Sequence, residues 1–244
     1  MKKLFIACLL LTSFGVQAQE KNEKYVMFEA ITLSMKSGDN AKLKEVMKTH
    51  NDTYHKSDPH KAQVYAINSG PNAGKMVWMM GPLQFADLDN RPEGKAHDDD
   101  WKKVQAFIES LSSVEYWRRD DDLSVLKDKT SNQLYVRFWN VSREYGFLVN
   151  DLLKKISETQ KALDRENSWT VWDNQFRQGS RGRHMATVGG FDKWADLDKD
   201  MGFKKKFEEL YGEDAWIPFW RTFDLAFTDS WDEIWTYLPE MSSK

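Results

Sequence analysis

The side chains best suited to bind a small molecule occur in two short β-rich segments, residues 25–33 (YVMFEAITL) and residues 135–141 (YVRFWNV). Side chains alternate between the two faces of a strand. If the valines and phenylalanines of these segments face the helices, then Glu29, Arg137 and Trp139 face the interior. A buried charge requires a partner, so Glu29 and Arg137 are expected to contact each other or a polar ligand. The alternative is the opposite strand phase, or a water-exposed position at the strand mouth.

Tryptophan is frequent, with 11 residues in 244. Trp78 and Trp172 fall on predicted strands, as Trp139 does, and such aromatic walls could stack on a sugar, an aromatic metabolite or a porphyrin. The alternative is that these rings only pack in the core. Trp78, Trp139 and Trp172 therefore join Glu29 and Arg137 as candidate ligand-binding residues.

His184 begins a predicted strand beside Arg181 and Arg183. In a haem protein this histidine would be an axial ligand, and the arginines would bind the propionates. The alternative is an exposed histidine at a strand end. His184 is the sixth candidate ligand-binding residue, and haem is kept as a possible cofactor.

Other histidines are interpreted as structural. The spacing of His50, His55 and His60 does not place them on one helical face, and His50 falls on an apolar stripe, as a core histidine would. His97 precedes three aspartates, which could bind a divalent cation, but acids also suit a helix N-terminus. No metal ligand is assigned.

Several enzyme classes leave recognisable motifs, and these are absent from the sequence. It contains no G-x-S-x-G, H-E-x-x-H, Walker or G-x-G-x-x-G pattern. A cofactor-independent enzyme needs only a shaped pocket and one base, so this class stays open. No catalytic residue is assigned, and the sequence does not decide whether the protein is an enzyme.

The elements that would position these residues occur twice. The stretch Lys75–Arg91 (KMVWMMGPLQFADLDNR) returns as His184–Asp200 (HMATVGGFDKWADLDKD), and Met76 aligns with Met185. The segment from Tyr25 is aligned with the segment from Tyr135. Such self-similarity indicates one structural unit written twice.

Each copy has the predicted order β-α-β-β-α-β. The first half is assigned to residues 19–119, a charged linker to 120–132, and the second half to 133–244. This order is typical of a ferredoxin-like α+β unit, an antiparallel sheet with helices on one face. Because one face of each sheet is bare, we expect the two sheets to pack together and close one barrel within the chain.

Composition and charge exclude some partners. The net charge is −3 and 41% of the residues are hydrophobic, so nothing favours nucleic acid or an anionic membrane as a partner. The mean hydropathy of −0.69 argues against an integral membrane protein. The oligomeric state is left open, with a monomer being compatible.

The N-terminus predicts a secretory signal peptide over residues 1–18. Two lysines precede a short apolar run, and a small-residue site ends at Ala18. The apolar run is too short for a membrane span. Cys8 is the only cysteine, so the mature chain would carry no thiol or disulfide. The predicted location is the periplasm or the exterior.

The element order resembles the dimeric α+β barrel superfamily, which includes antibiotic-biosynthesis-monooxygenase-type, NIPSNAP-type and chlorite dismutase-type proteins. The run from Trp78 through Phe85, Leu88 and Arg91 to Trp101 is similar to the NIPSNAP-type pattern, although Asp200 replaces the arginine in the second copy. The resemblance implies a barrel with a central pocket for a small apolar or aromatic ligand, and sometimes haem.

Three functions follow as expectations. The first is a secreted barrel that binds a small apolar or aromatic molecule in its interior. The second is an oxidoreductase or isomerase, cofactor-independent or haem-dependent. The third is an interaction protein without a functional pocket.

Overall fold

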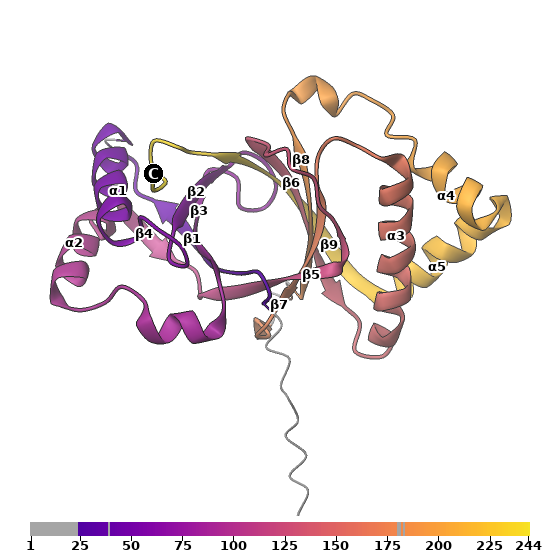
Figure 1. Cartoon of the computed structure of the whole chain (residues 1–244), viewed down its shortest axis with the longest axis horizontal. Coiled ribbons are helices and arrows are strands. Elements are labelled where there is room, and N and C mark those ends of the chain that lie inside the picture. Colours follow the sequence, from indigo (N-terminus) through magenta and orange to yellow (C-terminus); the bar gives the residue numbers. More distant parts are fainter. Residues whose placement is uncertain (1–23, 39, 180–181, 183) are drawn as a thin grey trace, which may run out of the picture.

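The computed structural model describes residues 24–38, 40–179, 182 and 184–244, and Figure 1 shows helices on two opposite sides of a central ring of strands. The expected signal peptide and the arginines Arg181 and Arg183 lie outside these residues. Among the described residues, no helix combines the length and the apolar character that a membrane span requires.

The first half contributes five strands and two α-helices to this arrangement. Its strands are β1 (Met27–Met35), β2 (Ala62–Ile67), β3 (Met76–Leu83), β4 (Ile108–Leu111) and β5 (Glu115–Val125). Its helices are α1 (Asn40–Tyr54), the 3-10 helix η1 (Phe85–Asn90) and α2 (Lys95–Gln105). The helical spacing of buried Leu43, Met47 and His50 fixes the face of α1 that meets the sheet.

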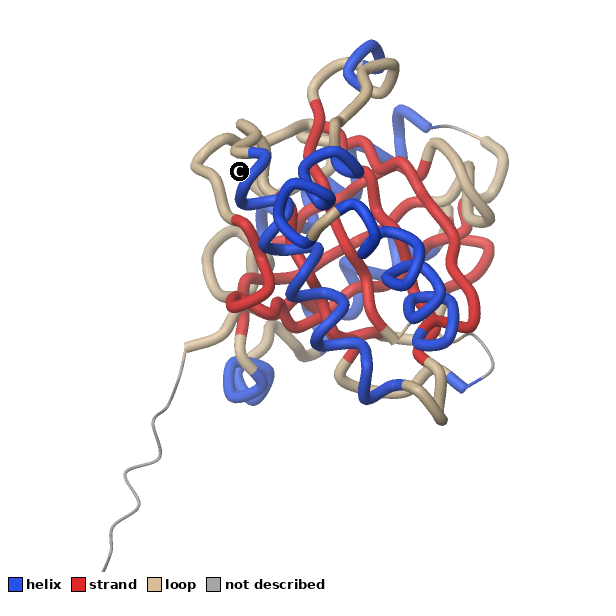
Figure 2. The backbone as a smooth tube through the Cα atoms, turned by 90° about the vertical axis from the view of Figure 1, so that its right-hand side faces the viewer, coloured by secondary structure: helices blue, strands red, loops and turns tan. Residues whose placement is uncertain are grey.

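The second half repeats the order with a longer helical layer. Its strands are β6 (Gln133–Val141), β7 (Trp169–Asn174), β8 (Met185–Phe191) and β9 (Phe227–Tyr237). Its helices are η2 (Gly146–Leu148), α3 (Val149–Leu163), η4 (Trp194–Asp196), α4 (Phe203–Tyr211), η5 (Glu213–Ala215) and α5 (Trp216–Ala226). In Figure 2, turned so that the right-hand side of Figure 1 faces the viewer, helices of this half cross in front of the strands.

The strands of the described residues form one antiparallel sheet in the order β3-β2-β9-β6-β8-β7-β5-β1-β4. An additional pairing of β1 with β3 closes eight of these strands into a barrel, with β4 outside the ring. Each half has the ferredoxin-like order, because its first strand lies between its third and its last. The halves join where β2 pairs β9 and β7 pairs β5. The predicted fold class is confirmed.

The strand pairing corrects one detail of the repeat. The ladders pair Ile31 with Trp78, and Arg137 with Thr187. Since Trp78 and Thr187 are equivalent in the aligned third strands, Arg137 corresponds to Ile31. The sequence alignment had instead matched residue 137 with residue 27. The correct alignment of the two first strands therefore differs from the sequence alignment by four residues. Because four is an even number, each side chain keeps its face of the strand, and only the equivalent residue in the other half changes.

The interior of the barrel is filled by apolar and aromatic side chains from both halves. Val136 and Phe138 lie in this cluster with Trp117 and Trp235. Phe138 also stacks on Trp231, with ring centroids 5.3 Å apart. The expectation that Val136 and Phe138 face the helices is therefore wrong, because the inner sheet faces need these large apolar groups to exclude water.

Two predicted boundaries also change. The acidic run Asp120–Asp122, expected to begin the linker, belongs to strand β5, which continues to pair with β7 as far as Val125. Helix α2 ends at Gln105, and Ile108–Leu111 form strand β4 beside β1, a strand that the predicted β-α-β-β-α-β order of the first half does not contain. In both places pairing with a distant strand overrides the local pattern.

Candidate ligand-binding cavity of the second half

A large cavity among the described residues lies outside the barrel, between the outer sheet face of the second half and its helices. This cavity has a volume of about 880 Å³ and is lined by residues of β6, β8, α3 and α5. Its floor includes Arg137, Trp139 and Gly189, and its walls include Ile156 and Phe223. A space of this size and lining is typical of small-molecule sites.

The cavity exists because the repeat has diverged at two positions. In the first half, Trp78 and Met80 on β3 point into the helix-facing core, where both are at least 96% buried. The equivalent residues of β8 are Thr187 and Gly189, both of which line the cavity. Replacing an indole and a thioether by a small side chain and a hydrogen leaves the space that the ring and the thioether fill in the other half.

The floor carries one polar network. Arg137 and Asp232 are bidentate partners, with Arg137 Nη2 2.7 Å from Asp232 Oδ2. The Tyr135 hydroxyl donates a hydrogen bond to Asp232 and accepts one from Arg137. Burial raises the pKa of Tyr135 to about 12, and its bond to the carboxylate acts in the same direction. Burial alone would raise the pKa of Asp232, but the bonds from Arg137 and Tyr135 hold it below its ordinary value.

This network leaves one donor group of Arg137 available. Within the described part of the chain, its Nη1 atom makes no hydrogen bond, whereas Nε and Nη2 are occupied by Asp232 and Tyr135. The guanidinium carbon also lies 5.3 Å from the Trp139 ring centroid. Arg137 thus presents N–H groups beside an aromatic face, an arrangement that can orient an oxygen atom of a flat ligand.

The remaining walls are aromatic and come from distant parts of the chain. Trp139 packs edge-on against Phe223, with centroids 4.9 Å apart, and Phe219 packs against Trp220 at 5.4 Å. Trp169 of β7 lines the same space. At the rim, Lys129 forms ion pairs with Glu166 at 3.0 Å and with Asp192 at 2.7 Å. These pairs connect the loops that frame the opening.

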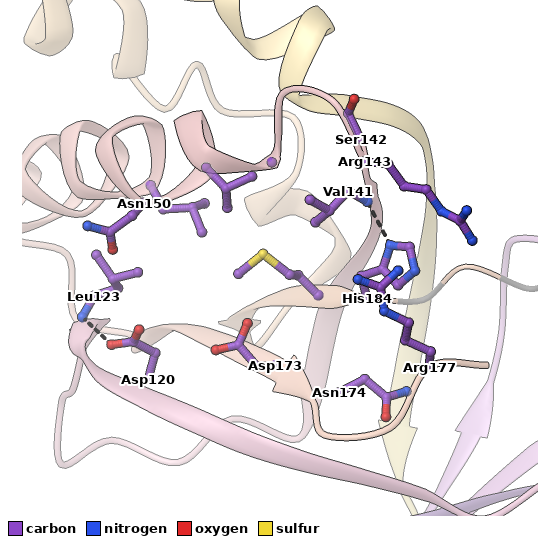
Figure 3. A pocket seen from close by; sticks show the side chains of 14 residues that line it. Asp120, Leu123, Val141, Ser142, Arg143, Asn150, Asp173, Asn174, Arg177 and His184 are labelled. Atoms are coloured by element: carbon purple, nitrogen blue, oxygen red, sulfur yellow. Dashed lines mark hydrogen bonds between the residues drawn. The ribbon is translucent and has the colours of Figure 1, made fainter. Parts of the chain in front are cut away.

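A smaller cavity of about 430 Å³ lies at the other end of α3, and Figure 3 shows its polar lining. Asp120 and Asp173 lie on one side, and His184 and Arg177 on the other. Burial, reinforced by the charge of Asp120, raises the pKa of Asp173 to about 6. Burial, followed by the charges of Arg177 and Arg143, lowers the pKa of His184.

The six candidate residues do not form one site. Arg137 and Trp139 line the large cavity, and His184 lines the small one. Trp172 belongs to the barrel interior, where its ring contacts Phe28. Trp78 lies in the core of the first half, and its indole N–H donates to Asn51 Oδ1 at 3.0 Å.

The expected pairing of Glu29 with Arg137 is wrong. Glu29 is fully buried and accepts two hydrogen bonds from Arg91, at 3.1 and 3.2 Å. Alternation places it with Met27 and Leu33 on the helix-facing side of β1, so the opposite strand phase holds. Arg91 follows η1 and returns to cover the carboxylate. Sequence reasoning missed this partner because Arg91 was read only as part of a family pattern.

The residues at His184 do not fit a haem ligand. The Val141 backbone N–H donates to His184 Nδ1 at 2.8 Å, so a neutral ring carries its proton on Nε2. Iron ligation by Nε2 requires that atom to be unprotonated. No histidine of the described residues lines the larger cavity. Neither cavity therefore offers the histidine that this form of haem binding needs.

Comparison with solved structures supports the barrel fold, whereas the sequence comparisons found no relative. No family model matches the chain, and no curated protein matches its sequence. Among solved structures, a candidate monooxygenase from Lactobacillus acidophilus superposes with a TM-score of 0.57, covering 91% of this chain and 97% of that protein at 9% identity. The chain has the ferredoxin-like α+β barrel fold.

Two further structures share this barrel fold. An anthrone oxidase-like protein has a TM-score of 0.54 and 11% identity, covering 89% of this chain and 92% of that protein. A mutant chlorite dismutase from Candidatus Nitrospira defluvii has a TM-score of 0.56 and 6% identity, covering 90% and 94%. At these identities the likeness concerns the barrel itself, and the site must be argued from its own residues.

Proposed function

We propose that this barrel protein is secreted and binds a small, mostly apolar aromatic molecule in the cavity between β6, β8 and helices α3–α5. The observation that carries the proposal is the replacement of Trp78 and Met80 by Thr187 and Gly189 at equivalent positions. The cavity walls are aromatic, while Arg137 supplies a hydrogen-bond donor on the floor. This site replaces the barrel interior, which side chains of both halves occupy.

The ion pair of Arg137 with Asp232 indicates which polar group the ligand carries. Asp232 already neutralises Arg137, so a carboxylate ligand would have to compete with an existing ion pair. A carbonyl or hydroxyl oxygen can instead accept from Nη1 while the pair stays intact. The favoured class is therefore a neutral aromatic ketone, quinone or phenol.

The test uses menadione, a neutral naphthoquinone, and measures its dissociation constant by isothermal titration calorimetry. Gly189→Leu should raise this constant at least tenfold, because its side chain enters the cavity from the floor. Gly189 has ordinary strand geometry, and an added Cβ would meet only Trp169 Cδ1 at 4.0 Å. The control is Gly38→Leu, where an added Cβ meets nothing within 4 Å.

Equal affinity in wild type and Gly189→Leu would contradict this site. Failure of a panel of naphthoquinones, anthrones and flat phenols to bind the wild type would favour the third expectation, an interaction protein. Native mass spectrometry of the freshly purified protein provides an independent check, since a retained small molecule should be absent from Gly189→Leu.

A second candidate function is oxidation of the bound molecule, favoured by the likeness to the candidate monooxygenase and the anthrone oxidase-like protein. Anthrone is the probe. Its conversion by dioxygen to anthraquinone and water places one oxygen atom in the new ketone and the other in water. The methylene proton of anthrone would pass to water, and Arg137 Nη1 would donate a hydrogen bond to the oxygen of the resulting enolate. Oxygen uptake faster than in buffer and abolished in Gly189→Leu supports this candidate, and uptake unaffected by the variant contradicts it.

Export is tested separately from binding. Expression of the full chain in a Gram-negative host should give a periplasmic protein whose first residue is Gln19. Retention of Met1 on the soluble cytoplasmic protein would contradict secretion without affecting the cavity.

A further inference from the structure

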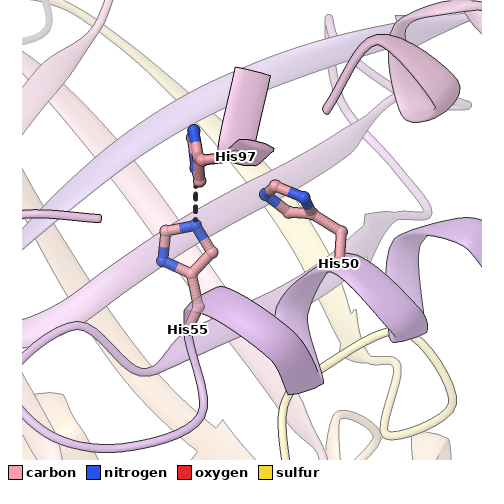
Figure 4. Close-up of side chains that lie close together, drawn as sticks. All are labelled: His50, His55 and His97. Carbon is pink, nitrogen blue, oxygen red and sulfur yellow. Dashed lines mark hydrogen bonds between the residues drawn. The ribbon is translucent and has the colours of Figure 1, made fainter. Parts of the chain in front are cut away.

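Three histidines of the first half lie close together in the structure, although nothing in the sequence groups His97 with His50 and His55. His50 and His55 come from α1 and its C-terminal end, and His97 comes from the first turns of α2 (Figure 4). One ring nitrogen from each lies within 4.8 Å of the other two. His50 and His55 are buried, whereas His97 keeps contact with solvent. Residues of two helices thus bring three imidazoles to one point.

The hydrogen bonds fix which nitrogen of each ring faces the others. His50 Nδ1 lies 3.1 Å from Asp100 Oδ2, and His97 Nδ1 lies 3.2 Å from Asp98 Oδ1. His55 Nδ1 lies 3.2 Å from the backbone carbonyl of His60. All three partners are acceptors, so each Nδ1 carries a proton and donates it. Such outer partners set the tautomer of metal-binding histidines in many proteins.

With Nδ1 protonated, each neutral ring has a lone pair on Nε2. The Nε2 atoms of His55 and His97 lie 3.4 Å apart, a contact in which two lone pairs would repel. His50 Nε2 is buried and has no hydrogen-bond partner among the described residues, although a buried polar atom normally has one. A positive centre between the three rings would satisfy all of these atoms together.

The spacing suits a divalent transition metal. Zinc binds imidazole nitrogen at about 2.0–2.1 Å with tetrahedral angles, which separates two ligand nitrogens by about 3.3–3.4 Å. The His55–His97 pair already has this separation. A ring nitrogen of His50 lies within 4.8 Å of the other two, and its ring would move towards them to complete three ligands. The rings of Trp78 and Trp101 pack beside His55 and His50, at 5.1 and 5.0 Å, and shield the point from bulk water.

We propose that His50, His55 and His97 form a metal site for Zn²⁺ or a similar divalent transition ion, with a water molecule as the fourth ligand. The site joins α1 to α2 and is separate from the cavity of the second half. Because the rings converge only in the folded chain, the ion binds the native state and stabilises it. His97, at the solvent side, is where the ion enters.

The experiment uses untagged full-length protein, stripped with dipicolinate and titrated with ZnCl2 against a fluorescent chelator. The expected result is one equivalent of Zn²⁺ per chain. His97→Ala should raise the dissociation constant at least about a hundredfold, since one of three ligands is lost. The matched control is His60→Ala, because the His60 ring bonds to the Asp87 carbonyl and is outside the cluster. It should stay within about threefold of wild type.

Two further measurements test the site, and the first uses the wild type alone. Co²⁺ added to the wild type should give the visible absorption of a tetrahedral ion, and Zn²⁺ should remove it. Zn²⁺ should also raise the melting temperature of the wild type and of His60→Ala, but not of His97→Ala. Wild type that binds no Zn²⁺, or that binds it as His97→Ala does, overturns the proposal and assigns the contact to a proton shared between His55 and His97.

Discussion

At the scale of single residues, the ion pair of Glu29 and Arg91 contributes to the stability of the first half. Glu29 is fully buried on the helix-facing side of β1, whereas the Arg91 side chain is 39% exposed. A buried carboxylate that loses its partner is costly, while the neutral amide of glutamine is less so. The two partners should therefore respond unequally to substitution.

Arg91→Met should lower the free energy of unfolding by about 2–4 kcal/mol, because it strands the Glu29 carboxylate. Glu29→Gln should cost less, about 1–2 kcal/mol, since the amide keeps part of the hydrogen bonding. Urea unfolding monitored by tryptophan fluorescence measures both. Neither variant should change menadione affinity, and a weaker affinity in Glu29→Gln would return this residue to the ligand site.

Asp173 gives the protein a pH-dependent stability. Its pKa of about 6 lies above the ordinary value of 3.8, so the native carboxyl holds its proton more tightly than the unfolded chain does. The stabilisation is complete below pH 3.8 and is lost as the pH rises towards 6. Asp173→Asn should therefore gain stability relative to wild type as the pH rises across this window, reaching on the order of 3 kcal/mol at its upper end.

Urea unfolding at several pH values between 4 and 7 measures this difference. The control is Asp128→Asn, which changes an exposed carboxylate and should leave the pH profile as it is in the wild type. A profile for Asp173→Asn parallel to that of wild type would show that the Asp173 carboxyl is solvated in solution.

At the scale of elements, the third strand of the first half fills the core beneath its helices, whereas the third strand of the second half leaves a cavity there. Met80 of β3 fills the helix-facing core, and Gly189 of β8 leaves that position open. Met80→Ala should destabilise the protein by about 2–4 kcal/mol through the cavity that it creates. Gly189→Ala should be neutral or stabilising by up to about 1 kcal/mol, because it restricts the unfolded chain without a clash.

Thermal unfolding of both variants checks this contrast. Met80→Ala should lower the melting temperature and Gly189→Ala should not, although the two positions are equivalent. Equal losses of stability would mean that the cavity at Gly189 closes in solution. Val171 of β7, which is fully buried and pairs with Thr187, offers a second reference, because Val171→Ala should be destabilising as Met80→Ala is.

The sequence was sufficient for the order of the main helices and strands, but it could not show which face of each strand points into the barrel. Alternation identified the strands, but it is symmetric, so it could not decide whether Phe138 or Trp139 points inward. The comparison of Trp78 with Thr187 was available in the repeat and would have located the cavity. The histidine cluster was not available, because His97 reaches His50 and His55 only through the packing of α2 on α1.

At the scale of the whole molecule, the repeat extends to the residues that close the barrel. Glu115 accepts a hydrogen bond from the Trp117 indole at 3.0 Å, and Glu233 accepts one from the Trp235 indole at 2.7 Å. These Glu-x-Trp units occupy equivalent places in β5 and β9, the strands that cross from one half to the other. The same hydrogen bond between a glutamate and a tryptophan therefore occurs at both places where the two halves pair to close the barrel.

The closed ring implies that neither half is stable alone. Separated from residues 24–125, the second half would expose Val136, Phe138 and Trp235 on one sheet face and leave the edges of β7 and β9 unpaired. We expect residues 126–244 to be insoluble or dimeric, since a second copy can cover the bare face as the first half does. Light scattering after size-exclusion chromatography distinguishes these states from a monomer.

Co-expression of residues 19–125 should restore a one-to-one complex, because the halves meet through two strand pairs and a shared apolar interior. A soluble, cooperatively folding monomer of residues 126–244 would mean that the interior contributes little, and that each sheet is stabilised by its own helices.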